Sequence, residues 1–204
     1  MIGGMDFVAD ALGGHRIFVQ LADLGPDALA VAEVLVQEGL TAWTLPASDV
    51  GAIRDAASIF GRRARVGAHG ATTPEQVASA FDAGARFVTS PVCFGDLVAA
   101  AQGRPLLPGA LTPSEVVWAT HAGASAVQVV PADSMGTSYS RSLLALVSGV
   151  QIVATGGLER FQAEMWLEAG AVAVGLTGLT PTGDVDLDDV RRRAQTFDRL
   201  VSGN

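Results

Sequence analysis

In the stretch Asp82-Ala83-Gly84-Ala85-Arg86-Phe87-Val88-Thr89-Ser90, one glycine joins the end of a helical pattern to a short apolar strand. Glycine is favoured at this junction because the residue after a helix end often takes a positive φ. The same junction recurs as Glu38-Gly39-Leu40, Ala122-Gly123-Ala124 and Ala169-Gly170-Ala171, and the four glycines are 45, 39 and 47 residues apart. Each interval is about the length of two strand–helix units, so the chain is expected to consist of four similar quarters.

Short apolar strands alternate with helical patterns along the whole chain. The predicted strands are residues 17–21, 40–45, 65–68, 87–90, 105–107, 126–130, 151–154 and 171–175. Residues 28–37 and 74–81 have helical periodicity, and Thr73-Pro74-Glu75-Gln76 and Thr112-Pro113-Ser114-Glu115 are typical helix starts. Eight strands that are each followed by a helix predict an α/β fold of the (β/α)8 TIM-barrel type. We expect one barrel domain over residues 1–204, with a short N-terminal helix.

Composition and charge limit the possible partners. The 204 residues are 49% hydrophobic and 17% charged, which is typical of a compact protein, and the net charge of −8 argues against nucleic acid or an anionic membrane as the main partner. The basic run 191–193 stands beside Asp186, Asp188 and Asp189, so it is expected to be a solvated helix face. A single cysteine, no signal-peptide pattern and no apolar run long enough to cross a membrane favour the cytoplasm.

Two glycine-rich turns follow the last two predicted strands, and in a parallel barrel they lie at the end that carries active sites. They are Thr155-Gly156-Gly157 and Gly175-Leu176-Thr177-Gly178. Turns of this kind expose backbone N–H groups, and a helix N-terminus beside them favours a phosphate dianion. The threonines could add hydroxyl donors. The alternative is that these glycines only permit tight turns.

From its first strand to its last helix, the chain resembles the family of 2-keto-3-deoxy-6-phosphogluconate (KDPG) and 4-hydroxy-2-oxoglutarate (KHG) aldolases. The resemblance rests on five segments in order: residues 82–91, 105–109, 112–115, 129–133 and 155–157. It implies a (β/α)8 barrel, a homotrimer, and a phosphate site at the two glycine turns.

The catalytic positions of that family are not matched. By the resemblance, Gln128 stands at the position of the family's imine-forming lysine, and Ala42 at that of its general acid–base glutamate. Its carboxylate-binding arginine falls near Pro46, its threonine after the third strand becomes Gly70, and its strand-one arginine becomes Ala22. All thirteen basic residues are arginines, so no lysine can replace the missing one. An imine needs a primary amine, and the sequence therefore excludes a lysine imine.

Several residues could supply other chemistry. His69, after the third strand, could carry protons or could simply be hydrogen-bonded in a loop. Asp23 and Asp133 could form a carboxylate pair across the barrel mouth, or could cap helices. Cys93 could act as an acid, but an inert thiol is the simpler interpretation.

No cofactor is expected. Asp23, His69, Glu115 and Asp133 lack metal-ligand spacing, so no metal is predicted. His121 is expected on the far side of the barrel. Trp43, Trp118 and Trp166 fit barrel or interface packing better than cofactor binding.

Two interpretations of function remain, and the sequence leaves open whether the protein is an enzyme. In the first, it binds a small phosphorylated metabolite at the barrel mouth and acts as a lyase or isomerase by acid–base chemistry. In the second, it is a non-catalytic ligand-binding or assembly protein on an aldolase scaffold. Both expect a small-molecule partner and a homotrimer.

Overall fold

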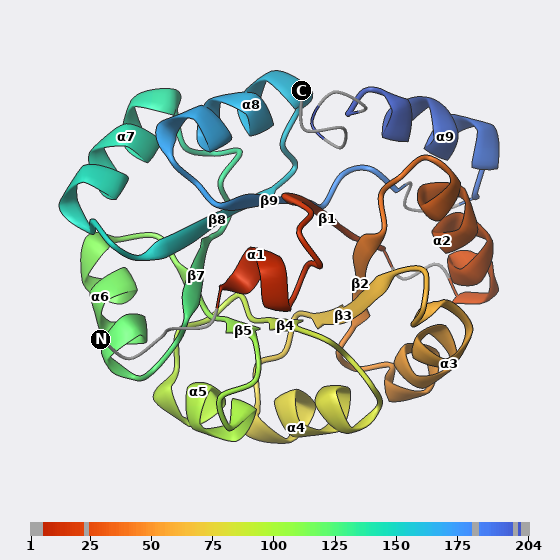
Figure 1. The fold of residues 1–204 in the computed structure, drawn as a ribbon, viewed down its shortest axis with the longest axis horizontal. Helices are drawn as coiled ribbons and strands as arrows, with labels where there is room; N and C mark the ends of the chain where they lie inside the picture. The colour runs from red at the N-terminus through yellow and green to blue at the C-terminus, as the bar shows by residue number, and fades with distance from the viewer. Residues whose placement is uncertain (1–5, 23–24, 181–183, 198–199, 201–204) are drawn as a thin grey trace.

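A ring of parallel strands surrounded by helices forms the protein (Figure 1). The structure, a computed structural model, describes residues 6–22, 25–180, 184–197 and 200. The sheet order is β5-β4-β3-β2-β1-β9-β8-β7-β6, with every pair parallel. The strands are β1 (Ile17–Gln20), β2 (Ala42–Pro46), β3 (Arg65–His69), β4 (Val88–Thr89), β5 (Leu106–Leu107), β6 (Gly109–Ala110), β7 (Ala126–Val129), β8 (Gln151–Gly156) and β9 (Ala173–Leu176).

β5 and β6 flank Pro108 and together occupy the fifth strand position. β5 pairs with β4, and β6 pairs with β7. Proline has no N–H to donate to a neighbouring strand, which interrupts the ladder at this point. The (β/α)8 barrel is thereby confirmed. The predicted strands correspond to β1–β5 and β7–β9, with ends that differ by no more than two residues. β6 was not predicted, because glycine and alanine after a proline make no apolar run.

All the described helices except α1 lie outside the ring, and their ends follow the sequence signals (Figure 1). Gly39, Gly84, Gly123 and Gly170 all have positive φ, between 81° and 114°, which confirms the repeated junction. Both predicted helix starts form capping boxes, Thr73 with Gln76 and Thr112 with Glu115. The outer helices are η1 (Gly25–Asp27), α2 (Ala28–Gln37), α3 (Val50–Phe60), α4 (Pro74–Asp82), α5 (Gly95–Ala101), α6 (Pro113–His121), α7 (Thr137–Leu146), α8 (Arg160–Ala169) and α9 (Leu187–Gln195). In the described part of the chain, no helix is long and apolar enough to cross a bilayer.

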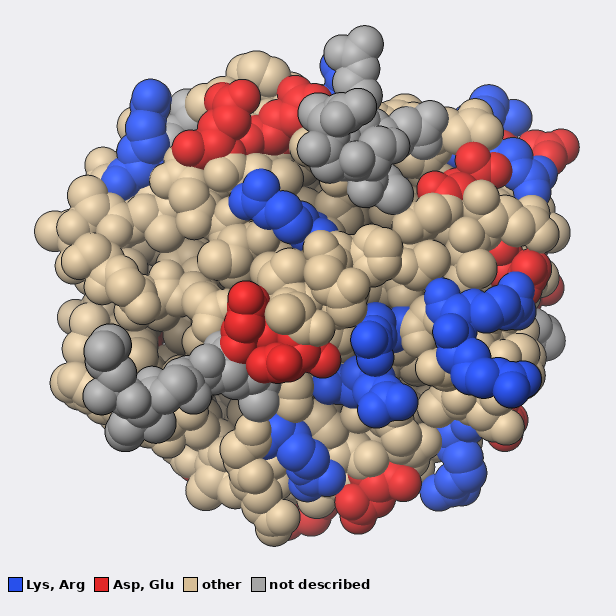
Figure 2. All heavy atoms as spheres, in the orientation of Figure 1, with Lys and Arg blue, Asp and Glu red and all other residues tan. Residues whose placement is uncertain are grey.

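Helix α1 (Phe7–Asp10) lies across the centre of the ring (Figure 1). The Phe7 ring packs edge-on against Phe87 just before β4, with 5.9 Å between centroids, and its N–H donates to Gln151 Oε1 at the start of β8. These contacts place α1 at the amino ends of the strands. Figure 2 shows the same end, where acidic side chains lie at the centre and basic side chains gather to the right of them. The open mouth is therefore at the opposite, carboxyl end.

Inside the barrel, the inward-facing residues nearest α1 form an apolar layer: Phe18, Ala42, Phe87, Leu107, Ala126, Val153 and Ala173. Two glycines make room for its large rings. A Cβ atom at Gly67 would lie 2.7 Å from the Phe87 ring, and one at Gly175 would collide with Phe18. Large and small residues therefore interlock, as expected for a closed barrel whose interior is filled by side chains.

This interlocking predicts the effect of a single methyl group. Gly67→Ala should lower the free energy of unfolding by about 1–3 kcal/mol, because the buried Phe87 ring has nowhere to move. The matched control is Gly136→Ala, where an added Cβ meets no atom within 4 Å. Urea denaturation would compare the two, and equal stabilities would contradict the packing described here.

Candidate functional site

A layer of neutral polar side chains lies above the apolar layer, toward the mouth. Side chains alternate between the two faces of a strand, so the residues that follow the apolar layer by two positions also face inward. We call this set the polar layer: Gln20, Thr44, His69, Thr89, Gln128 and Thr155. Thr44, Thr89, Gln128 and Thr155 are buried, whereas Gln20 and His69 are partly exposed.

Three hydrogen bonds organise this layer. Gln20 Nε2 donates to Thr89 Oγ1 over 3.3 Å, which links β1 to β4 across the interior. Thr44 Oγ1 and His69 Nδ1 lie 3.0 Å apart on the neighbouring strands β2 and β3. Gln128 Nε2 donates to the Ser90 carbonyl over 2.7 Å.

Two atoms of the polar layer have no hydrogen-bond partner among the described residues. They are Gln128 Oε1 and Thr155 Oγ1, on the adjacent strands β7 and β8. A third unpartnered atom, Trp43 Nε1, belongs to the other side of the wall, because Trp43 packs in the core between strands and outer helices. An unpaired buried polar group costs stability, so a hydrogen-bond partner at either atom would be favourable.

His69 is uncharged at neutral pH in this setting. Burial lowers the pKa of its imidazole from 6.5 to about 4, and a hydrogen bond from the imidazole to the Thr44 backbone opposes that shift only in part. The residue lies at the carboxyl end of β3, at the predicted place, and its Nδ1 is engaged with Thr44. At neutral pH, any proton transfer by His69 must therefore start from the uncharged form of its imidazole.

The two glycine turns lie side by side at the mouth. Thr155 pairs with Gly175 and Gly156 with Leu176, and Thr177 N–H donates to the Gly156 carbonyl over 2.9 Å. Gly157, Thr177 and Gly178 are exposed. The turns thus offer a shared rim of backbone to a ligand.

Asp133 occupies part of that rim. Its Oδ1 accepts a hydrogen bond from Gly157 N–H over 3.1 Å. The carboxylate lies against Gly156, where a Cβ atom would collide with it. A turn predicted to hold an anion therefore already holds one from its own chain. Sequence reasoning missed this contact, because the residues are 24 positions apart and nothing local signals it.

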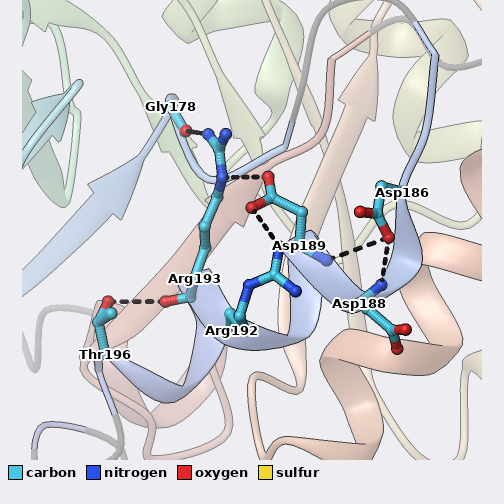
Figure 3. Close-up of polar contacts among 7 residues, drawn as sticks. All are labelled: Gly178, Asp186, Asp188, Asp189, Arg192, Arg193 and Thr196. Carbon is cyan, nitrogen blue, oxygen red and sulfur yellow. Dashed lines mark hydrogen bonds and ion pairs between the residues drawn. The ribbon is translucent and has the colours of Figure 1, made fainter.

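A cavity of about 890 Å³ lies behind these turns, between α8 and α9. Two arginines stand on its wall. Arg193 donates to Asp189 over 2.6 Å and to the Gly178 carbonyl over 3.4 Å (Figure 3), and Arg160 is 3.7 Å from Glu164. Its described lining residues are Gly157, Leu158, Glu159, Arg160, Leu176, Gly178, Leu179, Arg193, Gln195, Thr196 and Phe197.

Arginines 191–193 of α9 are all paired with acidic residues. Arg191 contacts Glu38 of α2 at 2.9 Å, and Arg192 and Arg193 both contact Asp189, at 3.1 and 2.6 Å. Figure 3 shows Asp189 between the two arginines and Asp186 capping the start of α9. The run is a charge-balanced helix face.

The remaining candidates have local structural contacts. Burial raises the pKa of the Cys93 thiol, so this group stays protonated and poorly reactive. Glu115 accepts hydrogen bonds from Leu111 N–H and Thr112 N–H at the start of α6, which lowers the pKa of its carboxyl group. Asp23 lies outside the described residues.

The described residues contain no group of three His, Cys, Asp or Glu side chains that could hold a metal. Trp43 and Trp166 are buried, whereas Trp118 is 45% exposed on α6.

The pKa of His69 predicts a pH dependence of stability. Between pH 6.5 and about 4, the unfolded chain binds a proton at His69 that the folded protein does not. Stability should therefore fall as pH falls through this window. NMR titration should place the His69 midpoint near 4, and His69→Gln should flatten the decline. A midpoint of 6 or above would show that the imidazole is not held neutral.

Comparisons with known proteins agree with this architecture. Residues 16–195 match the family model of KDPG and KHG aldolases. The chain is 29% identical over 166 residues to the 2-dehydro-3-deoxy-6-phosphogalactonate aldolase of Escherichia coli (strain K12), covering 76% of this chain and 80% of that protein. A 2-dehydro-3-deoxy-phosphogluconate aldolase of Treponema pallidum (strain Nichols) is 34% identical over 142 residues, 65% of each chain.

Among solved structures, the 2-keto-3-deoxy-6-phosphogluconate aldolase of Zymomonas mobilis ZM4 with 3-phosphoglycerate is similar, with a TM-score of 0.80 at 25% identity. The match covers 93% of this chain and 92% of that one. The protein therefore belongs to the KDPG and KHG aldolase family.

Proposed function

We propose that the protein binds a small phosphorylated metabolite at the carboxyl end of the barrel, with the phosphate at the two glycine turns and without a lysine imine. The observation that carries this proposal is the 3.1 Å hydrogen bond from Gly157 N–H to the Asp133 carboxylate. This bond supports the proposal because it is made between a backbone N–H of the turn and a carboxylate oxygen, and a phosphate oxygen could accept from the same N–H. Because Asp133 is exposed, its side chain can leave the turn when a ligand enters.

Two further observations support a phosphorylated ligand. Gly157 and Gly178 border a cavity that also carries Arg160 and Arg193, so guanidinium groups, each paired with a carboxylate in this state, lie beside the turns. The similar aldolase of Zymomonas mobilis was solved with 3-phosphoglycerate, a phosphate ester.

The catalytic form of this proposal is a lyase or isomerase reaction that uses acid–base chemistry. His69 and Asp133 would carry protons, with the side chain of Gln128 facing the ligand. Asp23 completes the proposed set but lies outside the described residues.

The alternative is ligand binding or assembly without catalysis. One observation favours it: His69 is engaged with Thr44 and Asp133 with Gly157, so neither group is free in this state. Proton exchange between substrate and solvent would distinguish the two forms.

The homotrimer and a cytoplasmic location belong to the same proposal. Exposed apolar side chains on neighbouring parts of α5 and α6 support an oligomer: Phe94, Val117 and Trp118 are 56%, 42% and 45% exposed.

The phosphate site can be tested with a matched series at the first turn. Gly157→Asp should abolish binding of phosphate esters, because it adds a second carboxylate beside Asp133. Gly157→Ala should retain binding, since an added Cβ lies 3.8 Å from the nearest Asp133 oxygen. Asp133→Asn should raise affinity about tenfold, because it keeps the shape of the side chain and removes the competing charge.

Isothermal titration with a phosphate ester would measure all three variants. Equal binding to Gly157→Asp and Gly157→Ala would place the site elsewhere. Weaker binding to Asp133→Asn would mean that the carboxylate contacts the ligand instead of competing with it.

The absence of imine chemistry has a direct test. Borohydride treatment with pyruvate, followed by intact-mass measurement, should give no stoichiometric adduct within the barrel. An amide nitrogen is not nucleophilic, because its lone pair is delocalised into the carbonyl group. Gln128→Lys alone should give little aldolase activity, since Ala42 cannot move a proton. An adduct mapped to a barrel residue, or a large gain from that single change, would overturn this part of the proposal.

A further inference from the structure

We propose that the polar layer binds an uncharged, hydroxyl-bearing end of the ligand, so that the protein selects a phosphorylated polyol over a phosphorylated sugar acid. This inference rests on the proposed function for the phosphate end and adds the chemistry of the other end. It comes from the two unpartnered buried atoms on β7 and β8.

Gln128 sets the requirement for a hydrogen-bond donor. Its Nε2 donates to the Ser90 carbonyl over 2.7 Å, and a carbonyl can only accept, so the orientation of the amide is determined. The free atom is therefore the acceptor Oε1, in a side chain that is 2% exposed. A ligand hydroxyl satisfies this oxygen by donating to it. An ionised carboxylate cannot donate and would place negative charge against a carbonyl dipole.

Thr155 provides the second contact. Gln128 pairs with Val153, two residues before Thr155, so both side chains lie on the inner face of neighbouring strands, one step apart. Thr155 is fully buried, and its hydroxyl has no partner among the described residues. A hydroxyl both donates and accepts, so it can bind a second alcohol group of the same ligand.

The charge of the layer excludes a carboxylate. Its described members carry no positive group, since His69 is neutral at pH 7. Arg65 occupies an inward-facing strand position at the amino end of β3, in register with Ala42 of β2. Its side chain lies beside Gly13, below the apolar layer. Burying a carboxylate without a cation is costly, whereas burying a hydroxyl against matching partners is not.

Part of the layer is open to solvent at the mouth. Gln20 on β1 and His69 on β3 are both partly exposed. The exposed turn at Gly157 follows Thr155 by two residues, so one short molecule can span from the layer to the phosphate site.

The test uses sorbitol 6-phosphate and 6-phosphogluconate, which differ only in an alcohol or a carboxylate at the first carbon. Isothermal titration at pH 7 should show sorbitol 6-phosphate binding at least about tenfold more tightly. Thr155→Val and Gln128→Met should each weaken its binding about tenfold, and Gln128→Met, which lies outside the phosphate turns, should leave the affinity for inorganic phosphate unchanged.

A stability measurement separates ligand binding from a structural role. Thr155→Val should not lower the melting temperature, because the lost hydroxyl has no partner. The matched control is Thr89→Val, which removes a buried hydroxyl bonded to Gln20 and should lower it.

Each result has a defined meaning. Equal binding of the two esters, or preference for 6-phosphogluconate, overturns this inference and leaves the phosphate site standing. An unchanged affinity of Thr155→Val and Gln128→Met for sorbitol 6-phosphate also overturns it, and would assign the two atoms to a buried water. If neither ester nor inorganic phosphate binds, the proposed function and this inference fail together.

Discussion

The interior of a closed parallel barrel must be filled by its own side chains. In this protein the inward-facing side chains form an apolar layer and a polar layer, and the position of the mouth depends on where one layer ends and the next begins. Inward-facing positions recur at every second residue, so each strand contributes one residue to each successive layer. The lower layer and α1 bury aromatic rings and leave no space. The next residue inward on each strand, from Gln20 to Thr155, therefore forms the floor of the mouth. A ligand site inside the barrel can therefore begin only at that level.

The fold could be predicted because its signals are local. A glycine with positive φ ends each repeated helix, and threonine, proline and Gln or Glu start two of the helices, so the boundaries could be read from short windows. Pro108 shows the limit of that approach. The fifth strand position is split by a residue without an N–H, and the small residues after it form β6 only because β7 supplies partners.

The site was predictable only in part, because its main contacts join distant residues. The resemblance placed Gln128 at a catalytic position, and the glycine turns could be read directly. However, the Ser90 carbonyl that orients Gln128 is 38 residues away, and Asp133 is 24 residues from the N–H that it occupies. The neutrality of His69 likewise depends on burial. Each of these properties requires the closed barrel, and no sequence window contains them.

The altered positions form a consistent set when they are considered as charges. The family resemblance places a lysine at Gln128, a glutamate at Ala42 and an arginine near Pro46. Removing only one of these would leave a charge in the barrel without its partner, which is strongly destabilising. Here all three are neutral, Ala42 has become part of the apolar layer, and the Gln128 amide is held by the Ser90 carbonyl. Among the described residues, the apolar layer and the polar layer are therefore both uncharged at neutral pH. A single lysine returned to position 128 would be surrounded by neutral side chains of the polar layer, which would lower its pKa.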